Sequence, residues 1–150
     1  MNFYHVAAFV GLSLIFFTVS CKTSRYVITV TNGDTTTQRL VLKRKDGSAA
    51  DTINVREGDK VLWRIKTKSV LAITEIADKN SITQPAFLTN HEPHKKSLSR
   101  TWVTKVNSVS KAEFDSVGYV KEYYFIKWKP KGPDSTKTFD PLMKIYPKKP

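Results

Sequence analysis

The sequence predicts an all-β protein that folds as an antiparallel β-sandwich. Three observations lead to this fold class. Short stretches rich in β-branched and aromatic residues recur along the chain, apolar and polar residues alternate within them, and turn signals containing glycine, asparagine or aspartate separate them. No long stretch shows the 3.6-residue apolar period of an amphipathic helix. Because 150 residues suit one domain, we place a single sandwich domain at residues 26–150.

Eight predicted strands follow one another along this domain. They are residues 26–31, 39–43, 52–55, 61–66, 70–76, 100–106, 119–128 and 142–146. Asn32-Gly33 and Lys45-Asp46-Gly47 are turn signals that close the first two strands. Residues 70–76 are apolar enough for us to expect burial on both faces of that strand. Residues 77–99 show only weak periodicity and predict a long loop.

The apolar start of the chain predicts a targeting segment. Residues 1–20 contain no Lys, Arg, Asp or Glu, and they end where polar sequence begins. Thr18-Val19-Ser20-Cys21 resembles the cleavage box of bacterial lipoproteins, in which a small residue precedes an acylated cysteine. The resemblance implies a signal peptide at residues 1–20, lipid attachment to Cys21 and a tether at residues 21–25. The alternative is a simple anchor or a secretory signal with an incidental cysteine.

The charge of the remaining chain is strongly positive. All 25 basic and 13 acidic residues follow residue 20 and give a net charge of +12, which favours anionic partners. A membrane surface supplies counter-charge, and acyl chains combined with basic charge give durable anchoring. Together with this charge, the resemblance to lipoproteins implies a lipid-anchored protein of a Gram-negative cell envelope, facing the periplasm or the cell surface. In that location we expect no nucleic-acid partner.

Two stretches carry a second resemblance. Residues 55–63, VREGDKVLW, are similar to a passage of cupredoxin-like domains in which a Gly-Asp turn leads into a central strand. Residues 123–128 and 139–145 are similar to the C-terminal pattern of those domains. The resemblance implies a Greek-key β-sandwich, and an immunoglobulin-like sandwich is the alternative. Residues 64–76 lack histidine, and residues 126–142 lack both cysteine and histidine, so the resemblance implies a scaffold without the blue-copper ligands.

Metal and catalytic chemistry have little local support in the sequence. His91 and His94 lie three residues apart in the predicted loop and could offer imidazole ligands to copper or zinc, although Lys95 and Lys96 beside them repel a cation. A periplasmic copper- or zinc-binding protein is therefore the alternative function, and otherwise we expect no cofactor. No nucleophile elbow, paired-carboxylate motif or glycine-rich phosphate loop is present. We expect no enzymatic activity, with a hydrolase of dispersed site residues as a further alternative.

The strand at residues 119–128 carries the leading candidate site. One side is apolar apart from a carboxylate, and its members are Val120, Glu122, Tyr124, Ile126 and Trp128. The other side interleaves cations with rings, and its members are Lys121, Tyr123, Phe125, Lys127 and Lys129. Such a surface can meet phosphates or carboxylates and stack on sugars. We predict that it binds an anionic envelope component or an acidic protein, with Arg64 and Lys66 on a similar outward face. The alternative interpretation is an ordinary solvated strand face.

Overall fold

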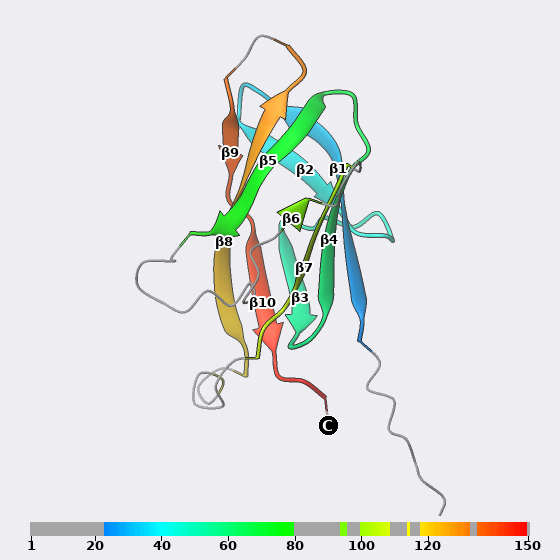
Figure 1. The fold of residues 1–150 in the computed structure, drawn as a ribbon, viewed down its shortest axis with the longest axis vertical. Coiled ribbons are helices and arrows are strands. Elements are labelled where there is room, and N and C mark those ends of the chain that lie inside the picture. Colours follow the sequence, from blue (N-terminus) through cyan, green and yellow to red (C-terminus); the bar gives the residue numbers. More distant parts are fainter. Residues whose placement is uncertain are drawn as a thin grey trace, which may run out of the picture.

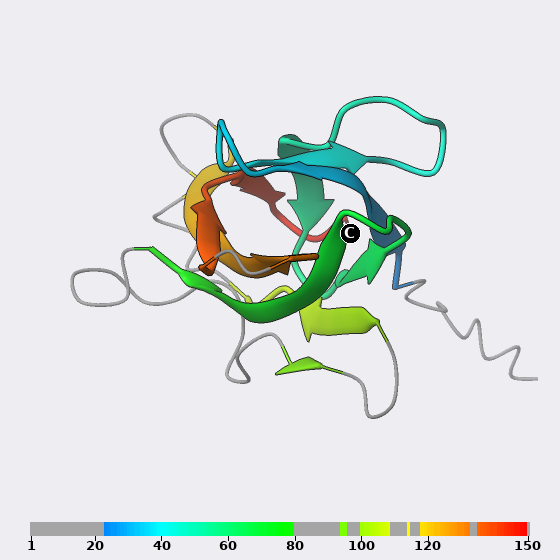
Figure 2. The same ribbon diagram turned by 90° about the horizontal axis from the view of Figure 1, so that it is seen from above.

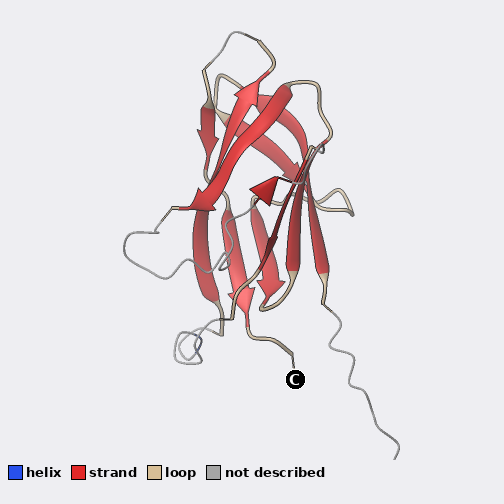
Figure 3. Ribbon diagram, viewed as in Figure 1, coloured by secondary structure: helices blue, strands red, loops and turns tan. Residues whose placement is uncertain are grey.

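The computed structural model describes residues 23–79, 94–95, 100–108, 114, 118–132 and 135–149. These residues form ten strands, coloured red in Figure 3: β1 (Arg25–Asp34), β2 (Arg39–Lys43), β3 (Thr52–Arg56), β4 (Lys60–Ile65), β5 (Val70–Asp78), β6 (His94–Lys95), β7 (Thr101–Lys105), β8 (Val120–Pro130), β9 (Lys137–Phe139) and β10 (Leu142–Tyr146). Each of the eight predicted strands coincides with one of them, and β6 and β9 are additional.

The strands form two mixed sheets that enclose a common interior (Figures 1 and 2). The first sheet has the order β2-β1-β4-β7-β6, and the second has the order β3-β10-β8-β5 with β9 also paired to β8. The predicted all-β sandwich is confirmed. Two pairs, β1 with β4 and β3 with β10, are parallel rather than antiparallel. Parallel neighbours need a crossover connection, and the chain passes through β3 of the second sheet between β1 and β4.

Large side chains from both sheets fill the interior. Trp63 of β4 and Tyr124 of β8 are fully buried and meet edge to face, with ring centroids 5.8 Å apart. Trp63 Nε1 donates a hydrogen bond to Tyr124 Oη over 3.4 Å. Burial raises the pKa of Tyr124, so its phenol remains neutral. An edge-to-face pair contributes about 0.5–1.5 kcal/mol beyond burial, and this pair joins the two sheets.

Further along β8, a glycine of β1 makes room for a second tryptophan. A Cβ atom at Gly33 would lie 2.7 Å from Trp128 Cζ3 and 2.7 Å from Val70 Cγ2. The Gly33 amide donates to Ser69 Oγ over 3.0 Å, and Ser69 Oγ donates to Asn32 Oδ1 over 2.8 Å. Close packing and these hydrogen bonds together hold the end of β1 against the start of β5.

The structure of β5 corrects one prediction. The sequence predicts burial on both faces, but Leu71 is 55% exposed, and only every third side chain, Val70, Ile73 and Ile76, is fully buried. The pairing of β5 with β8 shifts register twice within this stretch. Each β-bulge inserts a residue and re-aims the side chains that follow it. Burial along β5 therefore recurs at every third residue and not at every second residue, as it would in a regular strand.

The turn between β3 and β4 holds the beginning of β1. The Asp59 amide donates to Arg56 O over 3.1 Å, and Gly58 between them has a φ of 82°, which fits the third position of a type II turn. The buried Asp59 carboxylate accepts the Arg56 amide at 2.8 Å and the Ser24 amide at 3.2 Å. β1 then runs parallel to β4 through six paired positions. The presence of both residues of this Gly-Asp sequence is thus explained locally: Gly58 adopts the positive φ of the turn, and Asp59 accepts the two amide hydrogen bonds.

Candidate functional site

β8 places the predicted anion-binding residues on the outer face of the second sheet. Buried and solvent-facing side chains alternate along the strand. The inward set contains Tyr124, Ile126 and Trp128. The outward set consists of Lys121, Tyr123 and Lys129, which are exposed, and Phe125 and Lys127, which are half-buried. The structure therefore brings the five predicted residues of β8 onto one surface.

β10 and β3 extend this surface. Lys144 of β10 is paired directly with Lys121 across the two strands, and Lys144 Nζ lies 4.6 Å from the centroid of the Tyr119 ring. The Tyr119 and Tyr146 rings have centroids 5.4 Å apart, and the Arg56 guanidinium lies 5.9 Å from the Tyr146 centroid. The two adjacent rings of Tyr146 and Tyr119 thus lie between the cations of Arg56 and Lys144. We call this surface the basic–aromatic face, and its members are Arg56, Tyr119, Lys121, Tyr123, Phe125, Lys127, Lys129, Lys144 and Tyr146.

Among the lysines of the basic–aromatic face, Lys127 forms an ion pair with a described acidic residue. Lys127 Nζ lies 2.7 Å from Glu75 Oε2, in an ion pair that is partly exposed, and 5.1 Å from the centroid of the Phe125 ring. Lys121 and Lys144 have no ion pair with any acidic residue of the described chain. Like charges directly opposite each other destabilise a sheet. An anion bound between these two ammonium groups would relieve that repulsion.

Arg64 and Lys66 do not belong to this surface. Arg64 lies on β4, Lys66 lies just beyond its end, and both are exposed. β4 belongs to the first sheet, and the outer faces of two packed sheets point in opposite directions. The structure therefore separates these two cations from the five predicted residues of β8.

Four members of the basic–aromatic face are not among the predicted site residues: Arg56, Tyr119, Lys144 and Tyr146. The outward direction of Lys144 and Tyr146 can be recognised from their alternation with Met143 and Ile145, which are buried. The neighbourhood of β10 and β8 cannot be recognised in this way, because alternation within a strand carries no information about which strand lies beside it. The direct pairing of two lysines is visible only in the structure.

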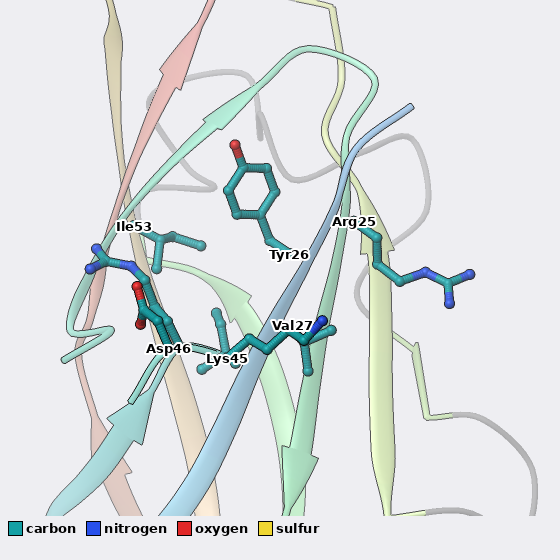
Figure 4. A pocket seen from close by; sticks show the side chains of 8 residues that line it. Arg25, Tyr26, Val27, Lys45, Asp46 and Ile53 are labelled. Atoms are coloured by element: carbon teal, nitrogen blue, oxygen red, sulfur yellow. The ribbon is translucent and has the colours of Figure 1, made fainter. Parts of the chain in front are cut away.

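A pocket lies along the first half of β1. β2 pairs with β1 only from Thr29 onward, and no described strand covers residues 25–28 on that side. A pocket of about 430 Å³ opens there. Its lining residues, most of them labelled in Figure 4, are Arg25, Tyr26, Val27, Ile28, Arg44, Lys45, Asp46 and Ile53.

The groups around this pocket do not converge on one ligand. Burial, helped by the nearby Asp59 carboxylate, raises the pKa of Tyr26. The Arg44 guanidinium donates to Thr52 O over 2.6 Å, so the protein backbone already engages it. Arg25 and Tyr26 leave β1 on opposite sides (Figure 4). We therefore assign the candidate site to the basic–aromatic face.

Two other predicted sites lie outside the described residues. Cys21 and His91 belong to stretches that the structure does not describe, and only the backbone of His94 is described, in β6. In the described ranges, no group of three or more His, Cys, Asp or Glu side chains is placed to hold a metal ion. The same ranges contain no helix that is long and apolar enough to span a membrane. Lipid attachment and metal binding at these residues stay predictions.

Comparison with known proteins adds no assignment. The chain matches no protein-family model and no curated protein sequence. The basic–aromatic face is therefore interpreted from its own chemistry.

Proposed function

We propose that this chain is a non-enzymatic, membrane-tethered lipoprotein of the Gram-negative cell envelope. Its cupredoxin-like β-sandwich, without blue-copper ligands, binds an anionic envelope component or an acidic protein through the basic–aromatic face. Acyl chains on Cys21 and the short tether after it confine the domain to the vicinity of a membrane.

The observation that carries this proposal is the direct pairing of Lys121 with Lys144 beside aromatic rings. These two ammonium groups on adjacent strands have no ion pair with a described acidic residue, and one phosphate or carboxylate can accept hydrogen bonds from both. Tyr119 already lies under Lys144, and Tyr123 is 45% exposed next to Lys121. Exposed rings beside cations can cover the apolar face of a sugar.

A phosphorylated or carboxylated glycan suits this combination best. The ammonium groups would bind the acidic substituent, and the exposed ring of Tyr123 would contact the sugar to which it is attached. Lipopolysaccharide phosphates and peptidoglycan carboxylates both provide this chemistry in the envelope. Because both ammonium groups lie on the surface of the sheet, with Lys121 exposed and Lys144 half-buried, binding should weaken as ionic strength rises.

The test uses the full-length protein, extracted from membranes in detergent, with lipopolysaccharide and soluble peptidoglycan fragments as probes. Affinity is measured at low and high salt for the native chain and for Lys121→Gln/Lys144→Gln. The control is Lys66→Gln/Lys68→Gln, which removes the same charge from exposed positions away from the basic–aromatic face.

We expect the Lys121→Gln/Lys144→Gln variant to bind at least one probe about tenfold or more weakly, since each charge-assisted hydrogen bond contributes about 1.5–3 kcal/mol. The control should bind like the native chain. Equal weakening of both variants would mean that binding depends on net charge alone. Unchanged binding in both would remove the basic–aromatic face from the proposal.

A further inference from the structure

The first sheet carries a separate row of cations at the end where β1 begins. Arg25 of β1 is paired in register with Lys60 of β4, and Lys60 is paired in register with Lys105 of β7. Ile28 and Val30 of β1 face the core, so the odd-numbered Arg25 faces outward with its two partners. Adjacent strands lie about 4.8 Å apart, so three cations follow one another within about 10 Å. We call Arg25, Lys60 and Lys105 the tether-end row.

The tether-end row forms no ion pair within the described chain. All three side chains are exposed. Side-by-side like charges cost free energy in a sheet. No described aromatic ring lies against any of the three cations, in contrast to the basic–aromatic face. The tether-end row is thus suited to an extended anionic surface rather than to a sugar.

The position of the tether-end row in the chain indicates which surface this is. β1 and β4 both begin, and β7 ends, at the same end of the first sheet. This end is the lower end of the molecule in Figure 1. Arg25 follows Cys21 by four residues, and four fully extended residues span at most about 14 Å. A lipid-anchored Cys21 would therefore hold Arg25 close to the phosphate layer of its own membrane, where the attraction of basic groups is strongest.

We propose that the tether-end row binds the phosphate headgroups of the anionic phospholipid bilayer in which Cys21 is anchored. This inference rests on the anchor in the proposed function and deepens it by assigning an orientation. The outer face of the first sheet, at the end that carries Arg25, Lys60 and Lys105, faces the bilayer. The basic–aromatic face, on the outer side of the second sheet, is left accessible to its partner.

The test is lysine footprinting of the full-length protein reconstituted into vesicles. One set of vesicles is phosphatidylcholine, and the other also contains phosphatidylglycerol. An amine-reactive ester labels accessible lysines, and peptide mass spectrometry reads the labelling rate at each position. Lys66 and Lys68 report on exposed positions in the connection between β4 and β5, and Lys121 and Lys144 report on the basic–aromatic face. Intact mass of the same sample shows whether Cys21 is acylated.

We expect phosphatidylglycerol to slow labelling of Lys60 and Lys105 several-fold, because each basic residue near an anionic leaflet gains about fivefold in partitioning. High salt should restore the labelling rate, and Lys66, Lys68, Lys121 and Lys144 should change little. An Arg25→Gln variant should weaken the protection of both lysines, whereas Arg64→Gln, a matched loss of one arginine on the same sheet, should not.

Two results would overturn the inference. The first is an equal labelling rate of Lys60 and Lys105 in both kinds of vesicle while Cys21 is acylated. This result would contradict the proposed orientation but not the proposed lipid anchor. Protection of Lys121 and Lys144 instead would place the basic–aromatic face on the bilayer. By contrast, protection of Lys60 and Lys105 in a chain without acylation would support the tether-end row and contradict the anchor in the proposed function.

Discussion

The two sides of β8 are made by alternate residues of one strand, yet they are subject to different constraints. On the inner side, Tyr124 and Trp128 are fully buried; Tyr124 meets Trp63 of the first sheet, and Trp128 lies close to the backbone of Gly33 in β1. On the outer side, Lys121 and Tyr123 are exposed, and nothing in the described core depends on them. Packing fixes the inner side, so its composition indicates the fold. The outer side is free of that constraint, so its mixture of cations and rings is the part of β8 on which the proposed function rests.

The largest effect on stability is expected where the inner side is most crowded. Gly33→Ala would place a Cβ atom 2.7 Å from both the Trp128 ring and Val70, and such overpacking typically costs about 1–3 kcal/mol. Chemical denaturation should show this loss in the free energy of unfolding. Lys129→Ala, which changes the outward neighbour of Trp128, is the control and should unfold like the native chain. If Gly33→Ala had the stability of the native chain, the Trp128 ring and Val70 would have to shift at little cost in free energy to accommodate the added Cβ atom.

A smaller effect is expected from Tyr124→Phe, which removes the acceptor of Trp63 Nε1. Loss of one buried hydrogen bond should cost about 1 kcal/mol at neutral pH. The same substitution on the outer side, Tyr123→Phe, should leave the free energy of unfolding unchanged. A similar loss in both variants would contradict the distinction between the two sides.

The pH dependence of unfolding sharpens the same comparison. The folded state raises the pKa of Tyr124 by burial, and that of Tyr26 by burial and by Asp59. Stability from a raised phenol pKa is fully present below the ordinary value of about 10 and is lost as the pH rises through the folded pKa. The native chain should therefore lose stability above about pH 10. Denaturation at several alkaline pH values should show a shallower loss for Tyr124→Phe, and an identical slope would contradict this assignment.

The smallest effect on stability is expected on the outer side. Lys121→Gln/Lys144→Gln should change the free energy of unfolding by no more than about 0.5 kcal/mol, because surface substitutions outside the core are usually mild. The sign should be stabilising, since the substitutions remove two like charges that face each other. A loss comparable to that of Gly33→Ala, measured by the same denaturation, would show that these lysines support the fold.

Much of the fold could be predicted because strand formation depends on local pattern. The prediction for residues 39–43 matches β2, and the predicted sides of β8 are confirmed. Strand order and bulges depend on contacts between distant residues, so the parallel pairs and the period of three in β5 could not be predicted. β9 was missed because three residues, of which only Phe139 is buried, are too short to show alternation.

The candidate site divides in the same way. Sequence alternation was sufficient to group Lys121, Tyr123 and Lys129 on one face. It could not place Arg64, because the sheet to which a strand belongs depends on the topology. The partnership of Lys121 with Lys144 and the alignment of Arg25, Lys60 and Lys105 depend on register between strands. Register is set by the packed core, so these surface features follow from residues that they do not touch.

The parallel pairing of β1 with β4 also has a mechanical consequence. Any tension transmitted along the chain from residues before Ser24 enters the domain at the Asp59 carboxylate and then runs along β1. That direction is roughly perpendicular to the ladder hydrogen bonds, so the six paired positions of β1 and β4 share the load in shear and are not peeled apart one by one. A domain attached to a membrane through this end could therefore hold a bound partner under tension without losing its first strand.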